Sequence, residues 1–128
     1  MKILLDTNFI IGCVNQKIDF IQMANDLFDE KIEWIVPQEV LNELGYLKDR
    51  RGMKIRDKEA AIIGFEMLQK IEPRPTIVNL GVTKNIDIGI INYILDKPII
   101  LATLDKELKN RVKNKIMTIR GKNSLEIV

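Results

Sequence analysis

The chain has 128 residues, of which 46% are hydrophobic and 30% are charged, and its formal net charge is +2. This composition predicts one globular domain over residues 1–128 and excludes a disordered or low-complexity chain. No apolar run reaches the roughly 18 residues that cross a bilayer, so we expect a cytoplasmic protein without a membrane partner.

The chain contains no histidine and a single cysteine, Cys13. One cysteine forms neither an intramolecular disulfide nor a thiolate zinc cage, and we expect Cys13 to pack in the core. Without histidine, the commonest general base and the usual zinc ligand are both missing. Any catalysis must therefore depend on carboxylates, lysines or hydroxyl groups.

Apolar patterning predicts strands and helices that alternate along the chain. In chain order we expect a strand at 2–5, a helix beginning at 7, a helix at 19–29, a strand at 33–36, helices at 37–47 and 56–71, a strand at 76–80, a helix at 84–95, a strand at 99–103, a helix at 105–114 and short strands at 116–119 and 125–128. This alternation is typical of an α/β domain whose mostly parallel sheet is covered by helices on both faces.

Two of the predicted strands end on a carboxylate. The stretches "KILLD" and "PIILATLD" place Asp6 and Asp105 directly after buried strands. In α/β folds, ligands bind outside the carboxyl ends of the strands, so these two side chains are candidates for one site. Either aspartate also fits the cap of the helix that follows it, and the sequence leaves both interpretations open.

Two further acids fall within or beside the apolar stripes of predicted helices. Glu43 lies three residues after Val40 and four before Leu47, and Asp87 lies three residues before Ile90. A buried carboxylate without a partner is costly, and it normally binds a cation or becomes protonated. Alternatively, Glu43 pairs with a basic residue across the core, and Asp87 is a first-turn acid favoured by the helix dipole.

Four acids without a neighbouring histidine or cysteine suggest a site of oxygen ligands for a hard cation, Mg²⁺ or Mn²⁺. The stretches that carry these acids, "ILLDTN", "VPQEVLNEL", "NIDIGIINYI" and "PIILATLDKELK", resemble the four signature segments of the PIN domain family. Their order and spacing match over essentially the whole chain. The C-terminal part is similar to the archaeal and eukaryotic branch linked to ribosomal RNA processing, and the size also suits the toxin of a toxin–antitoxin pair.

The resemblance implies a Rossmann-like three-layer α/β/α sandwich and a Mg²⁺- or Mn²⁺-dependent endoribonuclease that cleaves single-stranded RNA. By motif match, the residues that bind metal and carry catalysis would be Asp6, Glu43, Asp87 and Asp105. Polar neighbours of the metal would be Asn8, Thr103 and Glu107, although Glu107 also fits a first-turn helix acid. The family further implies an antitoxin or a ribosome-assembly partner and a homodimer.

The sequence departs from many of these relatives at "NID", where an extra acid often precedes the third carboxylate. This departure leaves open whether one or two ions bind.

Basic residues gather in two segments, 48–58 and 106–122. From these segments we expect contacts to the RNA backbone by Arg50, Arg51, Lys54, Lys106 and Lys109. The alternative is that these side chains are merely solvated.

Two other functional classes remain open. One is a PIN-like module that binds RNA or protein without cleaving. The other is a small α/β phosphotransfer or signalling domain, although the paired N-terminal acids of receiver domains are absent.

Overall fold

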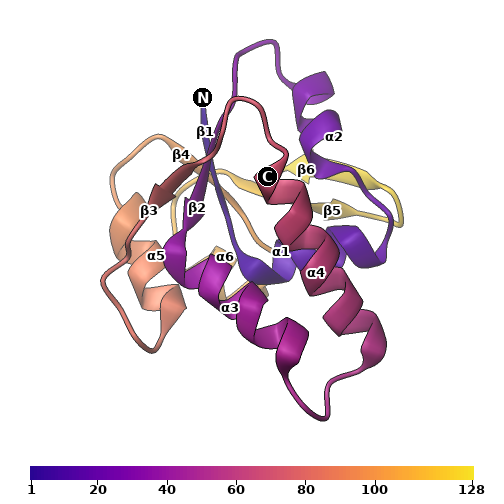
Figure 1. The fold of residues 1–128 in the computed structure, drawn as a ribbon. Coiled ribbons are helices and arrows are strands. Elements are labelled where there is room, and N and C mark those ends of the chain that lie inside the picture. Colours follow the sequence, from indigo (N-terminus) through magenta and orange to yellow (C-terminus); the bar gives the residue numbers. More distant parts are fainter.

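The computed structural model describes all residues, 1–128, and contains one six-stranded sheet (Figure 1). The strands are β1 (Lys2–Leu5), β2 (Glu33–Pro37), β3 (Thr76–Val78), β4 (Ile99–Ala102), β5 (Ile116–Arg120) and β6 (Ser124–Ile127). Their order is β3-β2-β1-β4-β5-β6; the first five are parallel, and β6 runs antiparallel to β5.

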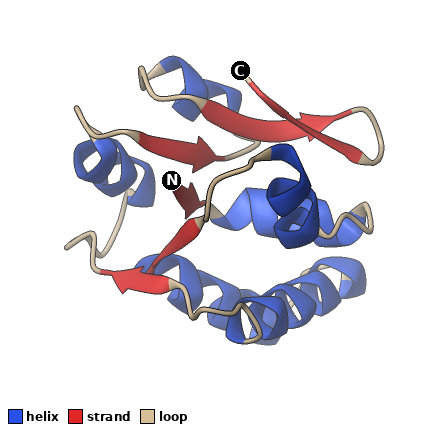
Figure 2. Ribbon diagram, turned by 90° about the horizontal axis from the view of Figure 1, so that it is seen from above, coloured by secondary structure: helices blue, strands red, loops and turns tan.

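Six helices cover the two faces of the sheet (Figure 2). They are α1 (Thr7–Asn15), α2 (Phe20–Leu27), α3 (Gln38–Asp49), α4 (Ile55–Gln69), α5 (Ile86–Ile94) and α6 (Lys106–Asn110). Strand β1, which is fully buried from Ile3 to Leu5, shows how the two cores arise, because successive side chains of a strand point to opposite faces. Ile3 and Leu5 pack in the core beneath α1–α4, whereas Leu4 packs in the core beneath α5 and α6. The predicted α/β/α sandwich is therefore confirmed.

The strand order produces a topological switch point at the carboxyl ends of β1 and β4, the position that is called the crevice in open α/β sheets. From β1 the chain builds β2 and β3 on one side, and it then crosses to form β4 on the other side of β1. The connections that follow β1 and β4 leave in opposite directions, and open α/β sheets bind their ligands at such a point. This is also the sheet order of Rossmann-type folds.

Cys13 is buried, as predicted, and burial raises the pKa of its thiol to about 12. The longest helix, α4, has 15 residues, and no helix is long and apolar enough to cross a membrane.

Several predicted elements are shorter in the structure, including the following three. The strand at 76–80 ends at Val78, the helix at 84–95 begins at Ile86, and the helix at 105–114 ends at Asn110. Asn85 has a φ of 55°, a left-handed conformation that no right-handed helix continues through. After Asn110 the chain turns, and the side chain of Asn114 bonds to backbone carbonyls of the α5–β4 connection instead of continuing the helix.

Candidate active site

Asp6 lies at the carboxyl end of β1, where only 6% of its surface is exposed. Its Oδ1 accepts a hydrogen bond from the backbone N–H of Thr7 at 2.9 Å, and its Oδ2 accepts one from the Thr103 hydroxyl at 2.7 Å. Because Thr103 follows β4, the carboxylate joins the ends of the two central strands. Asp6 is thus both the cap of α1 and a fixed, buried acid at the crevice.

Asn8 and Thr103, predicted as neighbours of the site, belong to the same hydrogen-bond network. Asn8 Oδ1 accepts from the backbone N–H of Leu104 at 3.0 Å and lies 3.3 Å from the Thr103 hydroxyl. The backbone N–H of Asp105 donates to Thr103 Oγ1 at 3.2 Å. The network therefore fixes the segment that carries Asp105 relative to Asp6.

Asp105 caps α6, so one of the two interpretations left open by the sequence is confirmed. Its Oδ1 accepts from the backbone N–H groups of Glu107 at 2.9 Å and Leu108 at 3.2 Å. Its Oδ2 makes no hydrogen bond within the chain and remains available for a ligand. Glu107 is an exposed first-turn acid of α6.

Glu43 on α3 and Asp87 in the first turn of α5 are half-buried, and neither makes a hydrogen bond or an ion pair. The one ion pair of the chain joins the Met1 amine to Glu30. The alternative in which Glu43 pairs with a basic residue across the core is therefore wrong. The first-turn position of Asp87 is confirmed, but it leaves both carboxylate oxygens without a partner.

The pKa values show that these acids share one region. Burial raises the pKa of Asp6 to about 6; the hydrogen bonds from Thr103 and Thr7 oppose this shift, and the charges of Asp87 and Glu43 add to it. Burial also raises the pKa of Asp87, and the charges of Asp105 and Glu107 raise it further, whereas Arg111 lowers it. The charges of Glu43 and Asp87 therefore act on Asp6, and the charge of Asp105 acts on Asp87.

No three acidic, cysteine or histidine side chains stand close enough to hold an ion by protein ligands alone. Mg²⁺ is usually bound by one or two carboxylates together with waters and substrate phosphates, so such a cage is not required. Carboxylate oxygens, some without a partner and one of them deeply buried, are the donor set that hard cations prefer. The residues present fit Mg²⁺ or Mn²⁺.

Thr7 and Glu39 are two residues of this region that the sequence did not indicate. Thr7 follows Asp6, and its Oγ1 is the one buried side-chain polar atom of the chain without a hydrogen-bond partner. Glu39, in the first turn of α3, accepts hydrogen bonds from the backbone N–H groups of Leu80 at 3.0 Å and Gly81 at 3.1 Å. Although burial opposes it, hydrogen bonds from the Leu80–Val82 backbone hold the pKa of Glu39 below its ordinary value.

The contact from Glu39 fixes the β3–α5 connection, which leads to Asp87. On its other side this connection packs against Gly89 of α5, where an added Cβ would lie 2.9 Å from the Leu80 Cβ. The position of Asp87 therefore depends on the hydrogen bonds from Leu80 and Gly81 to Glu39 of α3, which are called the clamp below. The sequence position of Glu39 indicates only a first-turn acid, which the helix dipole favours.

The basic residues predicted to bind RNA lie in two separate places. Arg50, Arg51 and Lys54 belong to the α3–α4 connection, which Figure 1 shows projecting from the far end of α3. Lys106 is exposed in the first turn of α6, beside Asp105, whereas Lys109 Nζ lies 3.0 Å from the Thr118 hydroxyl. Lys109 is thus less free than Lys106 to contact a ligand.

The fold is a Rossmann-like α/β domain, and its acidic residues lie at the carboxyl ends of β1 and β4. The chain belongs to the PIN-like domain family, since the family model described as "PIN like domain" matches residues 3–122. It is 28% identical over 130 residues to Ribonuclease VapC4 of Methanocaldococcus jannaschii, covering 98% of this chain and 95% of that protein.

Two solved structures share the fold. The PIN domain endonuclease Utp24 superposes with a TM-score of 0.77 at 23% identity, covering 98% of this chain and 90% of the other. The structure of VapBC2 from Rickettsia felis, bound to a DNA fragment from its promoter, gives a TM-score of 0.63 at 16% identity. That match covers 94% of this chain and 100% of the other.

Proposed function

We propose that the protein is a metal-dependent endoribonuclease that hydrolyses phosphodiester bonds of single-stranded RNA at the crevice between β1 and β4. The observation that carries the proposal is the set of four acids at this crevice, which lack any basic partner within ion-pair distance. Membership of the PIN-like family and similarity to a protein named as a ribonuclease support this chemistry.

Asp6, Asp87 and Asp105 would hold Mg²⁺ or Mn²⁺. When bound, the ion would lower the pKa of an attacking water and stabilise negative charge on the phosphate. The Thr103 hydroxyl and the Thr7 N–H hold the Asp6 carboxylate, and the Asp105 cap of α6 leaves one oxygen directed away from the helix amides.

Glu43 has both oxygens free of hydrogen bonds and lies close enough to influence Asp6. It would orient the attacking water or complete the metal ligands. In the absence of histidine, this carboxylate is the candidate to accept the proton of that water. The leaving oxygen of the cleaved phosphodiester would then take its proton from solvent.

The phosphates of the substrate would be contacted by Arg50, Arg51, Lys54 and Lys106. Lys109 would contribute less because of its bond to Thr118.

A cytoplasmic location and a homodimer are part of the proposal. As partners we propose an antitoxin or a ribosome-assembly factor. These alternatives follow from relatives named as a VapC ribonuclease, a VapBC assembly and the endonuclease Utp24.

End-labelled single-stranded RNA, incubated with wild type and with Asp6→Asn in Mn²⁺, Mg²⁺ or EDTA, tests the proposal. We expect metal-dependent cleavage by wild type and a loss of at least about a hundredfold in the variant, equivalent to about 3 kcal/mol of transition-state stabilisation. Lys70→Gln, an exposed change far from the crevice, serves as the control and should cleave normally.

Equal cleavage by wild type and Asp6→Asn would show that the activity does not come from this site. RNA binding without cleavage by wild type, on single-stranded and structured RNAs alike, would identify a non-catalytic PIN-like module instead.

A further inference from the structure

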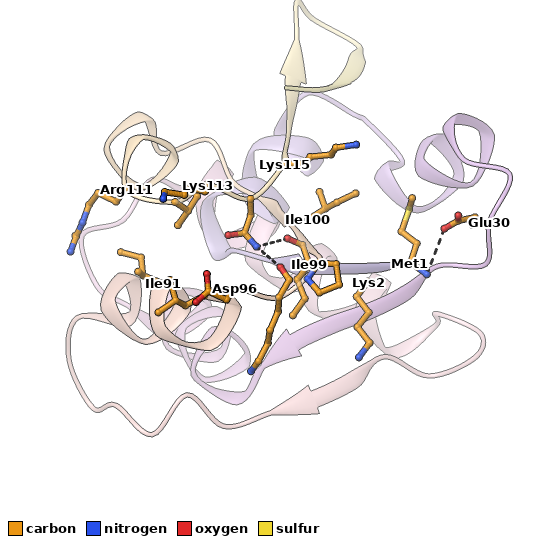
Figure 3. Close-up of a pocket in the computed structure, with 15 residues that line it drawn as sticks. Met1, Lys2, Glu30, Ile91, Asp96, Ile99, Ile100, Arg111, Lys113 and Lys115 are labelled. Atoms are coloured by element: carbon orange, nitrogen blue, oxygen red, sulfur yellow. Dashed lines mark hydrogen bonds and ion pairs between the residues drawn. The ribbon is translucent and has the colours of Figure 1, made fainter.

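A second recess lies at the opposite edge of the sheet, where β1, β4 and β5 begin (Figure 3). It is a cavity of about 850 Å³, bounded by the α5–β4 connection, the α6–β5 connection and the first residues of the chain. None of the four candidate catalytic acids lines it. The recess is therefore a separate surface from the crevice between β1 and β4.

The walls of this recess are strongly basic. Its charged side chains are Lys2, Lys97, Arg111, Lys113, Lys115, Glu30 and Asp96. Five positive charges against two negative ones leave an excess of three, which is larger than the net charge of +2 of the whole chain. None of the five basic side chains forms an ion pair, because the chain's one ion pair joins Glu30 to the Met1 amine.

The backbone that carries these cations is held by the side chain of Asn114. Its Nδ2 lies 3.2 Å from the carbonyl oxygen of Ile94, 3.0 Å from that of Lys97 and 2.9 Å from that of Ile99. These contacts join the connection before β4 to the connection before β5. The Lys97 ammonium also lies 4.4 Å from the centre of the Tyr93 ring, a cation–π distance that orients this side chain.

The cations surround the recess and do not converge on one point. In Figure 3, Lys115, Lys2 and Arg111 extend in different directions from the rim, and the apolar side chains of Ile91, Ile99 and Ile100 lie between them. A single small anion would contact only one or two of these groups. An extended polyanion can contact several in succession, with apolar parts of its monomers over the floor.

Arg111 connects this recess to the candidate active site. It lines the recess and is the C-cap of α6, the five-residue helix whose N-cap is Asp105. A chain of phosphates that follows α6 from Asp105 therefore reaches Arg111 and then the other cations of the recess. This continuity favours the substrate's own backbone over an unrelated acidic protein segment.

We propose that this recess is a second RNA-binding site, which holds the phosphate backbone of single-stranded RNA extending from the active site past Arg111. The inference rests on the proposed ribonuclease function and adds a specificity to it: the enzyme prefers RNA long enough to reach both edges of the sheet. Lys97, Lys113 and Lys115 contact phosphates, and Asn114 is a positioning residue that keeps the two basic connections together.

The test compares the double variant Lys113→Gln/Lys115→Gln with a control, Lys17→Gln/Lys70→Gln, which loses the same charge at exposed positions outside the recess and outside both basic segments. Fluorescence anisotropy in EDTA, where no cleavage occurs, measures binding of labelled single-stranded RNAs of about 20 and about six nucleotides over a range of salt concentrations. The slope of log K against log salt reports how many phosphates each protein contacts.

For the long RNA, we expect the recess variant to bind about tenfold more weakly than the control, with a slope shallower by about 1.4, the loss of two single-strand phosphate contacts. The difference between the two proteins should be smaller for the short RNA, because it does not extend over both edges of the sheet. Equal slopes and affinities for the long RNA would overturn the proposal. The proposal would also be overturned if a poly-glutamate peptide bound wild type but not the recess variant while RNA binding stayed unchanged. In that case the recess would bind an acidic protein segment.

The two proposals fail separately. If wild type cleaves no RNA but the slope still falls in the recess variant, the second site stands and the catalytic proposal fails. If wild type cleaves RNA and the slopes are equal, the catalytic proposal stands and the second site fails.

Discussion

The two edges of the sheet carry opposite charges, and neither the four acids of one edge nor the five cations of the other form ion pairs within the chain. The carboxyl edge gathers Asp6, Glu43, Asp87 and Asp105, whereas the amino edge is surrounded by lysines and Arg111. The two edges differ in burial, since Asp6 is only 6% exposed and Lys97, Lys113 and Lys115 are exposed to solvent. A buried charge is costly and a hydrated one costs little, so only the carboxyl edge opposes folding.

Asp6→Asn should reveal this cost as a gain in stability when metal is absent. At the 2.9 Å contact, the Asn Oδ1 can still accept the hydrogen bond from the Thr7 N–H. At the 2.7 Å contact the direction reverses, because the Asn Nδ2 can donate to the Thr103 hydroxyl oxygen. The pKa of Asp6 rises from 3.8 to about 6 on folding. Ionised Asp6 therefore destabilises the fold by about 3 kcal/mol at neutral pH, as an upper bound.

The sign of the pH dependence follows from this raised pKa. Between about pH 4 and pH 6 the folded state binds more protons at Asp6 than the unfolded state, so this group makes the protein less stable as the pH rises. In urea unfolding with EDTA, Asp6→Asn should exceed wild type by up to about 3 kcal/mol at neutral pH, and the gap should close towards pH 4.

The matched change at the other edge is Lys113→Gln, which should alter stability by less than about 0.5 kcal/mol at either pH. A variant Asp6→Asn that is no more stable than wild type at neutral pH would remove the contrast between the two edges.

Glu39→Gln should have a smaller effect on stability, with a local consequence at the carboxyl edge. The neutral amide weakens the hydrogen bonds that the Leu80 and Gly81 backbone groups now donate to a carboxylate. Because Glu39 is only partly buried, we expect a loss of about 0.5–1 kcal/mol. Hydrogen exchange should become faster at Leu80 and Gly81, and Mn²⁺ affinity should fall because this connection positions Asp87.

The control for Glu39→Gln is Glu66→Gln, a change at an exposed acid of α4 that forms no hydrogen bond or ion pair. It should leave the exchange rates at Leu80 and Gly81 and the Mn²⁺ affinity unchanged. If the Leu80 and Gly81 amides exchange at the wild-type rate in Glu39→Gln, the clamp does not position the third acid.

The sequence predicted a sheet covered by helices on both faces, because Ile3–Leu5 of β1 and all of β4 are apolar on both faces. Such a continuous apolar run is typical of a strand buried between helices. It also placed Asp6 and Asp105 correctly, because the chain leaves a parallel strand at the same edge each time. Asp105 also caps α6 through its Oδ1, which leaves its Oδ2 free for the proposed metal.

The features that escaped prediction depend on contacts between distant segments. Glu39 bonds to amides 41 and 42 residues further along the chain, and Asn114 bonds to carbonyls 15 to 20 residues before it. The basic recess joins Lys2, Lys97 and Lys113 only because β1, β4 and β5 are neighbours in the sheet. No local periodicity encodes these pairings.

We propose that the acids of the carboxyl edge form no ion pairs within the chain because they bind a divalent cation. Calorimetric titration of Mn²⁺ into wild type and into Asp6→Asn, near neutral pH and without RNA, tests this claim most directly. We expect saturable binding to wild type, with proton release because Asp6 has a raised pKa, and binding at least about tenfold weaker in the variant. Equal binding to both proteins, or no binding to wild type even at millimolar Mn²⁺, would contradict it.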